Sequence, residues 1–376
     1  MKKFLNKNNI FSGLRLRQIL NDLKRRPEDA AKDLSISHLK LQKILDGKAV
    51  LDLKLVTKIT SIWPIKITDI INPYYDKEPN FKIMRAVVSK QTKRVMSREG
   101  IDYYEYRDTV MSKNAPFRPE WIRQLSYVND NTPTNKALRW NRGHLLHQFT
   151  YFVGEVNFYY FDKNNKKRTA VMNTGDTMYI GPYVPHTFAT RNKNCNGFII
   201  AITFLDKITT EIQNELLDYG RKKSLMFFES KANNSINKVT VLKYNKAKLK
   251  KTTKDSFTIL KTKELASTKL AKSAKSYEIE VMKNNKLKQS SFAHQYIYVL
   301  SKNGSIKIEN KDIRVKCNDT IYIKPLTEHY FSSKGLKILI LSVDSKINDE
   351  AKLQLNQIGK KNLDRIIYDD TAWFKR

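Results

Sequence analysis

The stretch GHLLHQFTYF, residues 143–152, holds two histidines and a glutamine within five positions. Imidazole nitrogens and side-chain oxygens are ligands that proteins use for transition metals. The aromatic residues that follow are typical of a β-strand, which sends alternate side chains to opposite faces. His144 and Gln148 therefore share one face, and His147 points to the other. The spacing predicts that His144 and Gln148 act together, whichever face is the interior.

Five of the six histidines lie in two copies of an internal repeat, and only His38 lies outside it. The matching pairs of segments are GDTMYIGPYVPHTF (175–188) with NDTIYIKPLTEHYF (318–331), and LHQFTYFVGEVNF (146–158) with AHQYIYVLSKNGSIKI (293–308). Helix-like segments at 206–223 and 345–361 follow the two copies at one constant offset. Short segments rich in Tyr, Val, Ile and Phe, repeated in tandem, predict two all-β domains of similar fold.

The second copy of the repeat acts as an internal comparison for the histidines. It keeps a His-Gln pair at 294–295 and the late His329, but Ser291 stands where the first copy has His144. The second copy has therefore lost one potential ligand, although it keeps a histidine, His294, at the position that matches His147. A histidine that is kept where the ligand set is incomplete favours packing over metal binding. We therefore expect His147 to pack.

The first copy carries a pattern of possible ligands and glycines that runs His144-x-x-x-Gln148, Gly154, Gly175-Asp176 and Pro185-His186. This pattern resembles the two motifs of the cupin family, whose barrel holds a metal between facing strands. The resemblance implies His144, Gln148 and His186 as metal ligands, with Gln148 where the motif usually has Glu. Two imidazoles and one oxygen leave positions open for substrate and O2, as in non-haem Fe(II) oxygenases. Zinc or manganese also fits these ligand types, and the missing carboxylate favours an anionic substrate.

The formal net charge of +33 is spread along the chain. Residues 1–75 hold 15 Lys and Arg against 7 Asp and Glu, so the excess is not concentrated there. A dispersed charge indicates a compositional bias and makes a dedicated nucleic-acid face unlikely. The sequence has no apolar run of membrane-spanning length, and its N-terminus lacks the apolar core of a secretory signal. With only two cysteines, Cys195 and Cys317, we expect a cytoplasmic protein without a membrane partner.

Residues 14–71 have apolar positions at helical spacing, with Pro27 where a helix would begin and Gly47 where one would end. The segment AAKDLSISHLKLQKILDGK resembles the helix-turn-helix of phage-repressor-like proteins. The predicted fold is therefore mainly β with α. We expect a helix-turn-helix-like domain at 1–75, a catalytic cupin domain at 76–235 and a second, degenerate cupin domain at 236–376.

A repressor-like helical domain followed by tandem cupins, with RWNRGHLLHQ and MYIGPYVPHTF in the first, resembles one family over essentially the whole chain. This is the hydroxyethylphosphonate dioxygenase and methylphosphonate synthase family. The resemblance implies an Fe(II) enzyme that acts on 2-hydroxyethylphosphonate and O2. The dioxygenase branch is expected to have a Glu ligand six residues before the last histidine, where this chain has Ile180. The resemblance thus implies methylphosphonate and bicarbonate or CO2 as products, with hydroxymethylphosphonate and formate as the alternative.

The same resemblance implies four substrate-binding residues, namely Lys24, Arg98, Tyr106 and Asn141, of which Tyr106 and Lys24 are also implied in catalysis. The chain has neither a GxGxxG nor a Walker loop for a phosphonate, so side chains must bind it. An arginine fork suits two phosphonate oxygens. If Lys24 reaches the site, the helical domain acts as a lid, either in its own subunit or in a neighbour of a homo-oligomer.

Two other classes of function compete with this interpretation. A transcriptional regulator would combine a DNA-binding helical domain with a cupin sensor, and it predicts tight, sequence-selective binding to a DNA duplex. A sugar-phosphate isomerase or another metal cupin predicts turnover that does not consume O2. The tandem cupins and the complete ligand set of the first copy favour the oxygenase.

Overall fold

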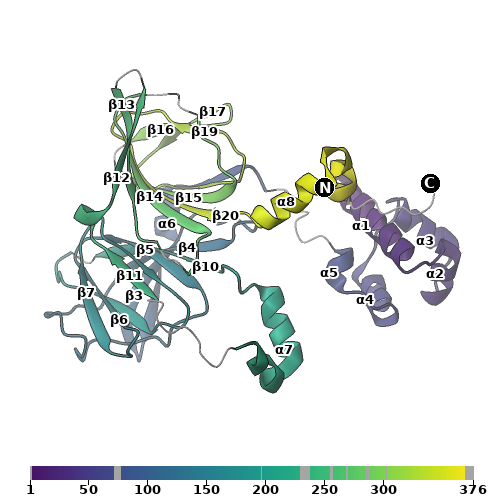
Figure 1. The fold of residues 1–376 in the computed structure, drawn as a ribbon, viewed down its shortest axis with the longest axis horizontal. Helices are drawn as coiled ribbons and strands as arrows, with labels where there is room; N and C mark the ends of the chain where they lie inside the picture. Colours follow the sequence, from purple (N-terminus) through teal and green to yellow (C-terminus); the bar gives the residue numbers. More distant parts are fainter. Residues whose placement is uncertain are drawn as a thin grey trace. The chain divides into compact units, whose positions relative to one another are not determined.

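The structure, a computed structural model, describes residues 2–71, 78–195, 197–228, 238–254, 257–267, 270–284, 286, 288–301 and 303–368. It is mainly β with helices, which confirms this part of the predicted fold (Figure 1). The chain forms two compact units. One comprises Met1–Lys77 with Ile347–Arg376, and the other comprises Glu78–Lys346.

The first unit is helical. Its elements are α1 (Lys2–Asp22), α2 (Pro27–Asp33), α3 (His38–Leu45), α4 (Leu53–Ile62), α5 (Ile67–Ile70), α8 (Asp349–Ile358), η3 (Lys360–Asn362) and α9 (Leu363–Tyr368). Leu16, Leu41 and Ile59 lie in its fully buried apolar core. Pro27 is the first residue of α2, and Gly47 has a positive φ of 69° just after α3, so the predicted start and stop signals are confirmed. None of the described helices is long and apolar enough to cross a membrane.

The second unit contains two β-barrels, each made of a seven-stranded and a three-stranded sheet. In the first barrel the large sheet has the order β11-β8-β5-β10-β4-β3-β2 and the small sheet β7-β6-β9. These strands are β2 (Arg94–Arg98), β3 (Ile101–Asp108), β4 (Phe117–Gln124), β5 (His147–Val153), β6 (Val156–Phe161), β7 (Lys167–Met172), β8 (Thr177–Ile180), β9 (His186–Thr190), β10 (Phe198–Phe204) and β11 (Val239–Leu242).

In the second barrel the large sheet has the order β1-β18-β15-β20-β14-β13-β12 and the small sheet β17-β16-β19. These strands are β1 (Phe81–Met84), β12 (Leu249–Lys254), β13 (Phe257–Glu264), β14 (Ala274–Val281), β15 (Ala293–Ser301), β16 (Gly304–Ile308), β17 (Lys311–Val315), β18 (Thr320–Ile323), β19 (His329–Phe331) and β20 (Lys337–Asp344). The remaining helices of this unit are α6 (Ala86–Gln91), α7 (Thr210–Ser224), η1 (Leu225–Phe227) and η2 (Tyr244–Lys246).

Three large apolar clusters hold the β unit together, beside a smaller one that includes Leu138 and Tyr159. One fills the first barrel between its large and small sheets, and a second, mostly aliphatic, fills the second barrel in the same way. The third joins the two large sheets back to back, where the Phe117 ring lies 6.4 Å from that of Tyr296 and 6.3 Å from that of Tyr322. Each large sheet is therefore covered on both faces, and only one face looks into a barrel.

The two barrels repeat each other down to single hydrogen bonds. The Tyr183 amide donates to the His144 carbonyl at 2.8 Å, and the Leu326 amide donates to the Ser291 carbonyl at 2.8 Å. Both donor residues have positive φ, at 56° and 65°. Ser291 therefore occupies the backbone position of His144, as the sequence repeat predicts.

The barrels also exchange edge strands across the boundaries expected from the sequence. Strand β1 precedes the whole first barrel but pairs with β18 of the second, with Phe81 opposite Ile323. Strand β11 follows the predicted boundary at 235/236 but pairs with β8 of the first barrel, with Val239 opposite Ile180. Sheet membership thus differs from the predicted segments 76–235 and 236–376 at both edges, because pairing between distant strands decides it. Residues 347–376 group with the helical unit.

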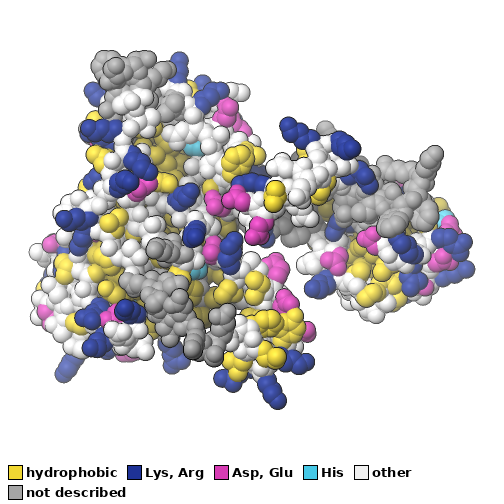
Figure 2. Space-filling model, viewed as in Figure 1, with side chains coloured by type: hydrophobic (Ala, Val, Ile, Leu, Met, Phe, Trp, Pro, Cys, Tyr) yellow, Lys and Arg dark blue, Asp and Glu magenta, His cyan; other side chains and the backbone are white. Residues whose placement is uncertain are grey.

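Lys and Arg side chains are scattered over the face seen in Figure 2, among uncharged and hydrophobic side chains. They do not gather into one patch on that face. This distribution agrees with the even spread of charge along the sequence.

Candidate metal centre

Three predicted ligands meet in the first barrel. Gln148 is the second residue of β5, His186 is the first of β9, and His144 lies in the loop before β5. The imidazoles of His144 and His186 are 5.4 Å apart between centroids and nearly perpendicular, at 87°. His144 Nε2 lies 3.2 Å from Gln148 Oε1. The two strands and the loop thus bring two imidazoles and one amide oxygen together.

The His144 ring has a carbonyl oxygen at each nitrogen. Its Nδ1 lies 2.7 Å from the Leu146 carbonyl oxygen, while Nε2 faces Gln148 Oε1. The side-chain amide of Gln148 is held in this orientation by its own Nε2, which donates to Thr150 Oγ1 at 2.9 Å. A neutral imidazole carries one proton, so it can donate to only one of the two oxygens. With the proton on Nδ1, the Nε2 lone pair and the Gln148 oxygen face each other, and a cation at this position satisfies both.

His186 presents the same tautomer. Its Nδ1 donates to the Val184 carbonyl at 2.8 Å, which leaves the Nε2 lone pair to accept from Asn141 Nδ2 at 3.0 Å. Burial is the main cause that lowers the pKa of His186 to about 3, so the ring is neutral near pH 7. A histidine binds a metal through a neutral imidazole, and its second ring nitrogen is typically held by a hydrogen bond. His186 meets both conditions, and the Leu146 carbonyl lies where it can accept from Nδ1 of His144.

Asn141 is tied to His186 through backbone and side chain. Asn141 Oδ1 accepts from the amides of Gly143 and His186, each at 2.9 Å, and the Asn141 amide donates to the His186 carbonyl at 3.2 Å. Its carboxamide is therefore fixed with Nδ2 beside the ligand nitrogen of His186. Asn141 thus lies where it can contact both the metal position and a substrate bound there.

Arg98 and Tyr106 lie at the same site. The Arg98 guanidinium lies over the rings of Tyr103 and Tyr104, at 5.1 and 4.8 Å, and Nη1 donates to the Arg139 carbonyl at 2.7 Å. Burial raises the pKa of Tyr106 to about 12, while the charge of Arg98 lowers it. The same charge also lowers the pKa of His186, so Arg98 is near both.

His147 faces away from these residues. Its Nδ1 accepts from Tyr179 Oη at 2.7 Å, and its ring stacks on Phe204 at 5.6 Å and 20°. Both partners belong to the cluster between the large sheets. His294 repeats this arrangement in the second barrel, where Nδ1 accepts from Tyr322 Oη at 2.8 Å. The opposite orientations of His147 and Gln148 confirm the alternation expected from the sequence.

Lys24 belongs to the helical unit, in the turn between α1 and α2, with a positive φ of 55° and an exposed side chain. Its contribution to the site stays a prediction.

The sequence did not indicate Glu120, a residue of β4 that also belongs to the first barrel. Burial raises the pKa of Glu120, while the positive charge of Arg94 lowers it. Its motif FRPEWIRQ is an ordinary alternating strand, and only the pairing of β4 with its neighbours reveals the carboxylate.

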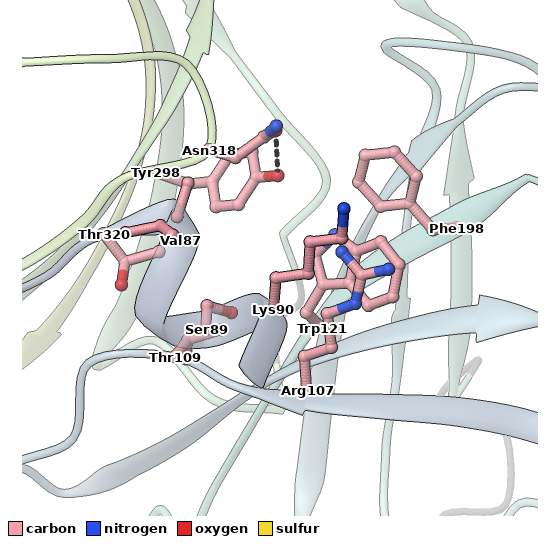
Figure 3. A pocket seen from close by; sticks show the side chains of 11 residues that line it. Val87, Ser89, Lys90, Arg107, Thr109, Trp121, Phe198, Tyr298, Asn318 and Thr320 are labelled. Atoms are coloured by element: carbon pink, nitrogen blue, oxygen red, sulfur yellow. Dashed lines mark hydrogen bonds between the residues drawn. The ribbon is translucent and has the colours of Figure 1, made fainter. Parts of the chain in front are cut away.

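A separate cavity of about 320 Å³ lies on the other face of the same large sheet. Figure 3 shows it between α6, β3, β4 and strands of the second barrel, with Lys90, Arg107 and Trp121 along one wall and Asn318 on another. The Arg107 guanidinium lies over Trp121 at 4.0 Å and pairs with Glu105, so its charge is already matched. This cavity shares strands with the metal centre but none of its side chains.

The second barrel keeps part of the same donor set. Gln295 and His329 are buried, at 8% and 1% exposure, and Ser291 replaces the third donor. His329 Nδ1 lies 3.0 Å from the Thr327 carbonyl, as His186 does from Val184. Gln295 Oε1 and His329 Nε2 have no hydrogen-bond partner among the described residues. No group of three His, Cys, Asp or Glu side chains in the described ranges could hold a metal, so a site with three side-chain donors there needs a donor of another type, which Gln148 Oε1 offers.

Comparison with known proteins places the chain. No protein-family profile matches it. A methylphosphonate synthase from Nitrosopumilus maritimus (strain SCM1) is 37% identical, over 97% of this chain and 96% of the relative. The chain belongs to the methylphosphonate synthase family. This confirms the family resemblance found in the sequence.

Two further proteins extend the comparison. A structure of HEPD from Streptomyces albus, with 2-hydroxyethylphosphonate and Fe(II) bound, has a TM-score of 0.90 and 24% identity, and the match covers 98% of this chain and 99% of that one. The family fold therefore extends over the helical unit and both barrels. An (S)-2-hydroxypropylphosphonic acid epoxidase from Streptomyces wedmorensis is 31% identical over 108 residues, which are 28% of this chain and 52% of that protein.

Proposed function

We propose that this protein is a mononuclear Fe(II), O2-dependent methylphosphonate synthase that cleaves the carbon–carbon bond of 2-hydroxyethylphosphonate. The products are methylphosphonate and bicarbonate or CO2. Family membership at 37% identity over nearly the whole chain supports this reaction. The observation that carries the metal site is the convergence of His144, Gln148 and His186, in which His144 Nε2 faces Gln148 Oε1 at 3.2 Å and the two imidazoles lie 5.4 Å apart.

In this proposal His144 Nε2, Gln148 Oε1 and His186 Nε2 hold the metal. These donors fit Fe(II) because His186 Nδ1 donates to the Val184 carbonyl, which leaves its Nε2 lone pair for a metal, and because His144 Nε2 and Gln148 Oε1 lie 3.2 Å apart at the same site. When bound, Fe(II) supplies the reactivity toward O2 and a Lewis-acid position for substrate oxygens. Ile180 supports the synthase branch, because this fully buried side chain lies opposite Gln148 in the sheet and offers no carboxylate.

The remaining residues bind and orient the phosphonate. Arg98 retains N–H groups beyond the one bonded to Arg139, and its guanidinium is fixed by two tyrosine rings. Asn141 Nδ2 lies 3.0 Å from His186 Nε2, and with a metal on that nitrogen it would be free to donate to a substrate oxygen. Tyr106 stays protonated because burial raises its pKa to about 12, so its hydroxyl acts as a donor.

We also propose the finer features of the organisation. The helical unit is helix-turn-helix-like and contributes Lys24 to substrate binding and catalysis, within a homo-oligomer. The two barrels are a catalytic cupin and a degenerate cupin. The scattered charge supports an enzyme over a DNA-binding regulator.

The test is anaerobic reconstitution of the full chain with Fe(II), followed by addition of 2-hydroxyethylphosphonate and O2. Phosphorus NMR should show methylphosphonate with consumption of O2, and His186→Ala should show neither. Hydroxymethylphosphonate as the main product would assign the chain to the dioxygenase reaction. Turnover without O2 uptake would refute an oxygenase altogether.

A further inference from the structure

The first barrel has an inward-facing carboxylate that the proposed reaction has not used. Glu120 lies in β4 between Trp121 and Pro119, and β4 alternates. Trp121 faces the cavity on the outer side of the sheet, as Figure 3 shows, so Glu120 points into the barrel. Ile122, two residues on, belongs to the cluster inside the barrel, which fixes the same orientation.

The sheet register aligns Glu120 with the ligand strand. Glu120 is opposite Ala201 of β10, and Ala201 is opposite Thr150 of β5. Thr150 is the residue that orients the Gln148 amide. Ala201, which has a small side chain, is the one residue between Glu120 and Thr150 in this row.

Glu120 has charged neighbours but no bonded partner. No hydrogen bond or close ion pair joins its carboxylate to a side chain or backbone group that the structure describes. The charge of Arg94 favours its ionised form, and its own charge raises the pKa of Tyr106. Glu120 therefore lies within electrostatic reach of a proposed substrate-binding residue, in the same row as the threonine that orients Gln148.

The excess of positive charge at the site favours a further anion. His144, Gln148 and His186 are neutral donors, and Arg98 adds a positive charge beside the dication. A phosphonate dianion offsets the metal alone. One carboxylate inside the barrel offsets the charge of Arg98 without occupying a coordination position.

We infer that Glu120 is the charge-compensating residue of the metal centre, which stabilises a dication held by two histidines and a glutamine without ligating it. The inference rests on the proposed metal site and adds a residue to it. The second barrel lacks this residue, because Tyr277 takes the position of Glu120 in the equivalent register. That row continues with Ile340 and Ile297, which are larger than Ala201 and Thr150 at the equivalent positions of the first barrel.

The test measures dication affinity in the full chain, using anaerobic Fe(II) or Co(II) alone as the probe. Glu120→Gln keeps the side-chain shape but removes the charge, and it should weaken binding roughly tenfold. Glu155→Gln is the matched control, because it removes an exposed carboxylate from the same barrel. The control should change the affinity less than about twofold.

A relocated charge distinguishes electrostatics from a structural role. Glu120→Gln combined with Gln148→Glu moves the carboxylate into the ligand set, and it should recover the affinity lost in the single variant. Equal affinity of wild type and Glu120→Gln would overturn the inference, as would failure of the double variant to recover. If the wild type binds no dication that His186→Ala removes, the metal site itself is wrong and the role of Glu120 fails with it.

Discussion

The two barrels share one fold and differ in what fills them. Equivalent backbone hydrogen bonds place His144 and Ser291 at the same position, and Gln148 and Gln295 lie at equivalent points of paired strands. The first interior holds a complete donor set, whereas the second replaces one donor with serine. The comparison teaches that strand register can be kept while a site is lost through a few inward-facing side chains.

The space around the donors differs as well. The row Glu120, Ala201 and Thr150 in the first barrel corresponds to Tyr277, Ile340 and Ile297 in the second. Larger, mainly aliphatic side chains fill the second interior, in keeping with its aliphatic core. A barrel with only two neutral donors in an apolar interior binds a dication poorly.

The largest expected effect comes from deleting the same late histidine in each barrel. His186→Ala should weaken Fe(II) binding by more than about a hundredfold and abolish turnover, because it removes one of three ligands. His329→Ala, its counterpart, should leave Fe(II) stoichiometry and turnover unchanged. Iron content and methylphosphonate formation measure both. Loss of iron in His329→Ala with an intact fold would place the metal in the second barrel and contradict the proposed site.

Restoring the lost donor should give the second barrel a metal site like that of the first. Ser291→His completes the donor set beside Gln295 and His329, whose free acceptor atoms are buried. We expect the metal content with Co(II) to rise from one toward two equivalents per chain, with weaker binding at the new site because it lacks a nearby carboxylate. A folded variant that still binds one equivalent would show that more than one donor separates the barrels.

The outward-facing histidines should behave alike in the two barrels. His147→Ala leaves the buried Tyr179 hydroxyl without its acceptor and should cost about 1–3 kcal/mol of unfolding free energy. Iron binding should persist. Urea unfolding and iron content report the two properties separately. Clean loss of iron with unchanged stability would refute the opposite orientations of His147 and Gln148.

Much of this site could be predicted from the sequence because it depends on local alternation and on a repeat. The two-residue period of a strand places Gln148 and His147 on opposite faces. The second copy of the repeat, which keeps His294 at the position of His147, indicates that this histidine packs. Glu120 could not be predicted, because only the pairing of β4 with β10 brings it into line with Thr150. The exchange of β1 and β11 between barrels is likewise set by pairing between distant strands.

The smallest expected effect is a pH dependence of stability. Burial lowers the pKa of His294 to about 4 from its ordinary value of 6.5, so the folded state favours the neutral ring. Its contribution is complete above pH 6.5 and is lost as the pH falls toward 4. His294→Gln should make the acid-side fall in unfolding free energy of the metal-free protein shallower. An unchanged slope would contradict the burial of this ring.

The most direct test of the account is the position of iron in the molecule. Crystals of the full chain soaked anaerobically with Fe(II), measured on both sides of the iron absorption edge, should show one anomalous peak per chain. We predict that peak within about 2.0–2.3 Å of His144 Nε2, Gln148 Oε1 and His186 Nε2. A peak beside His147, or one between Gln295 and His329 in the second barrel, would contradict it.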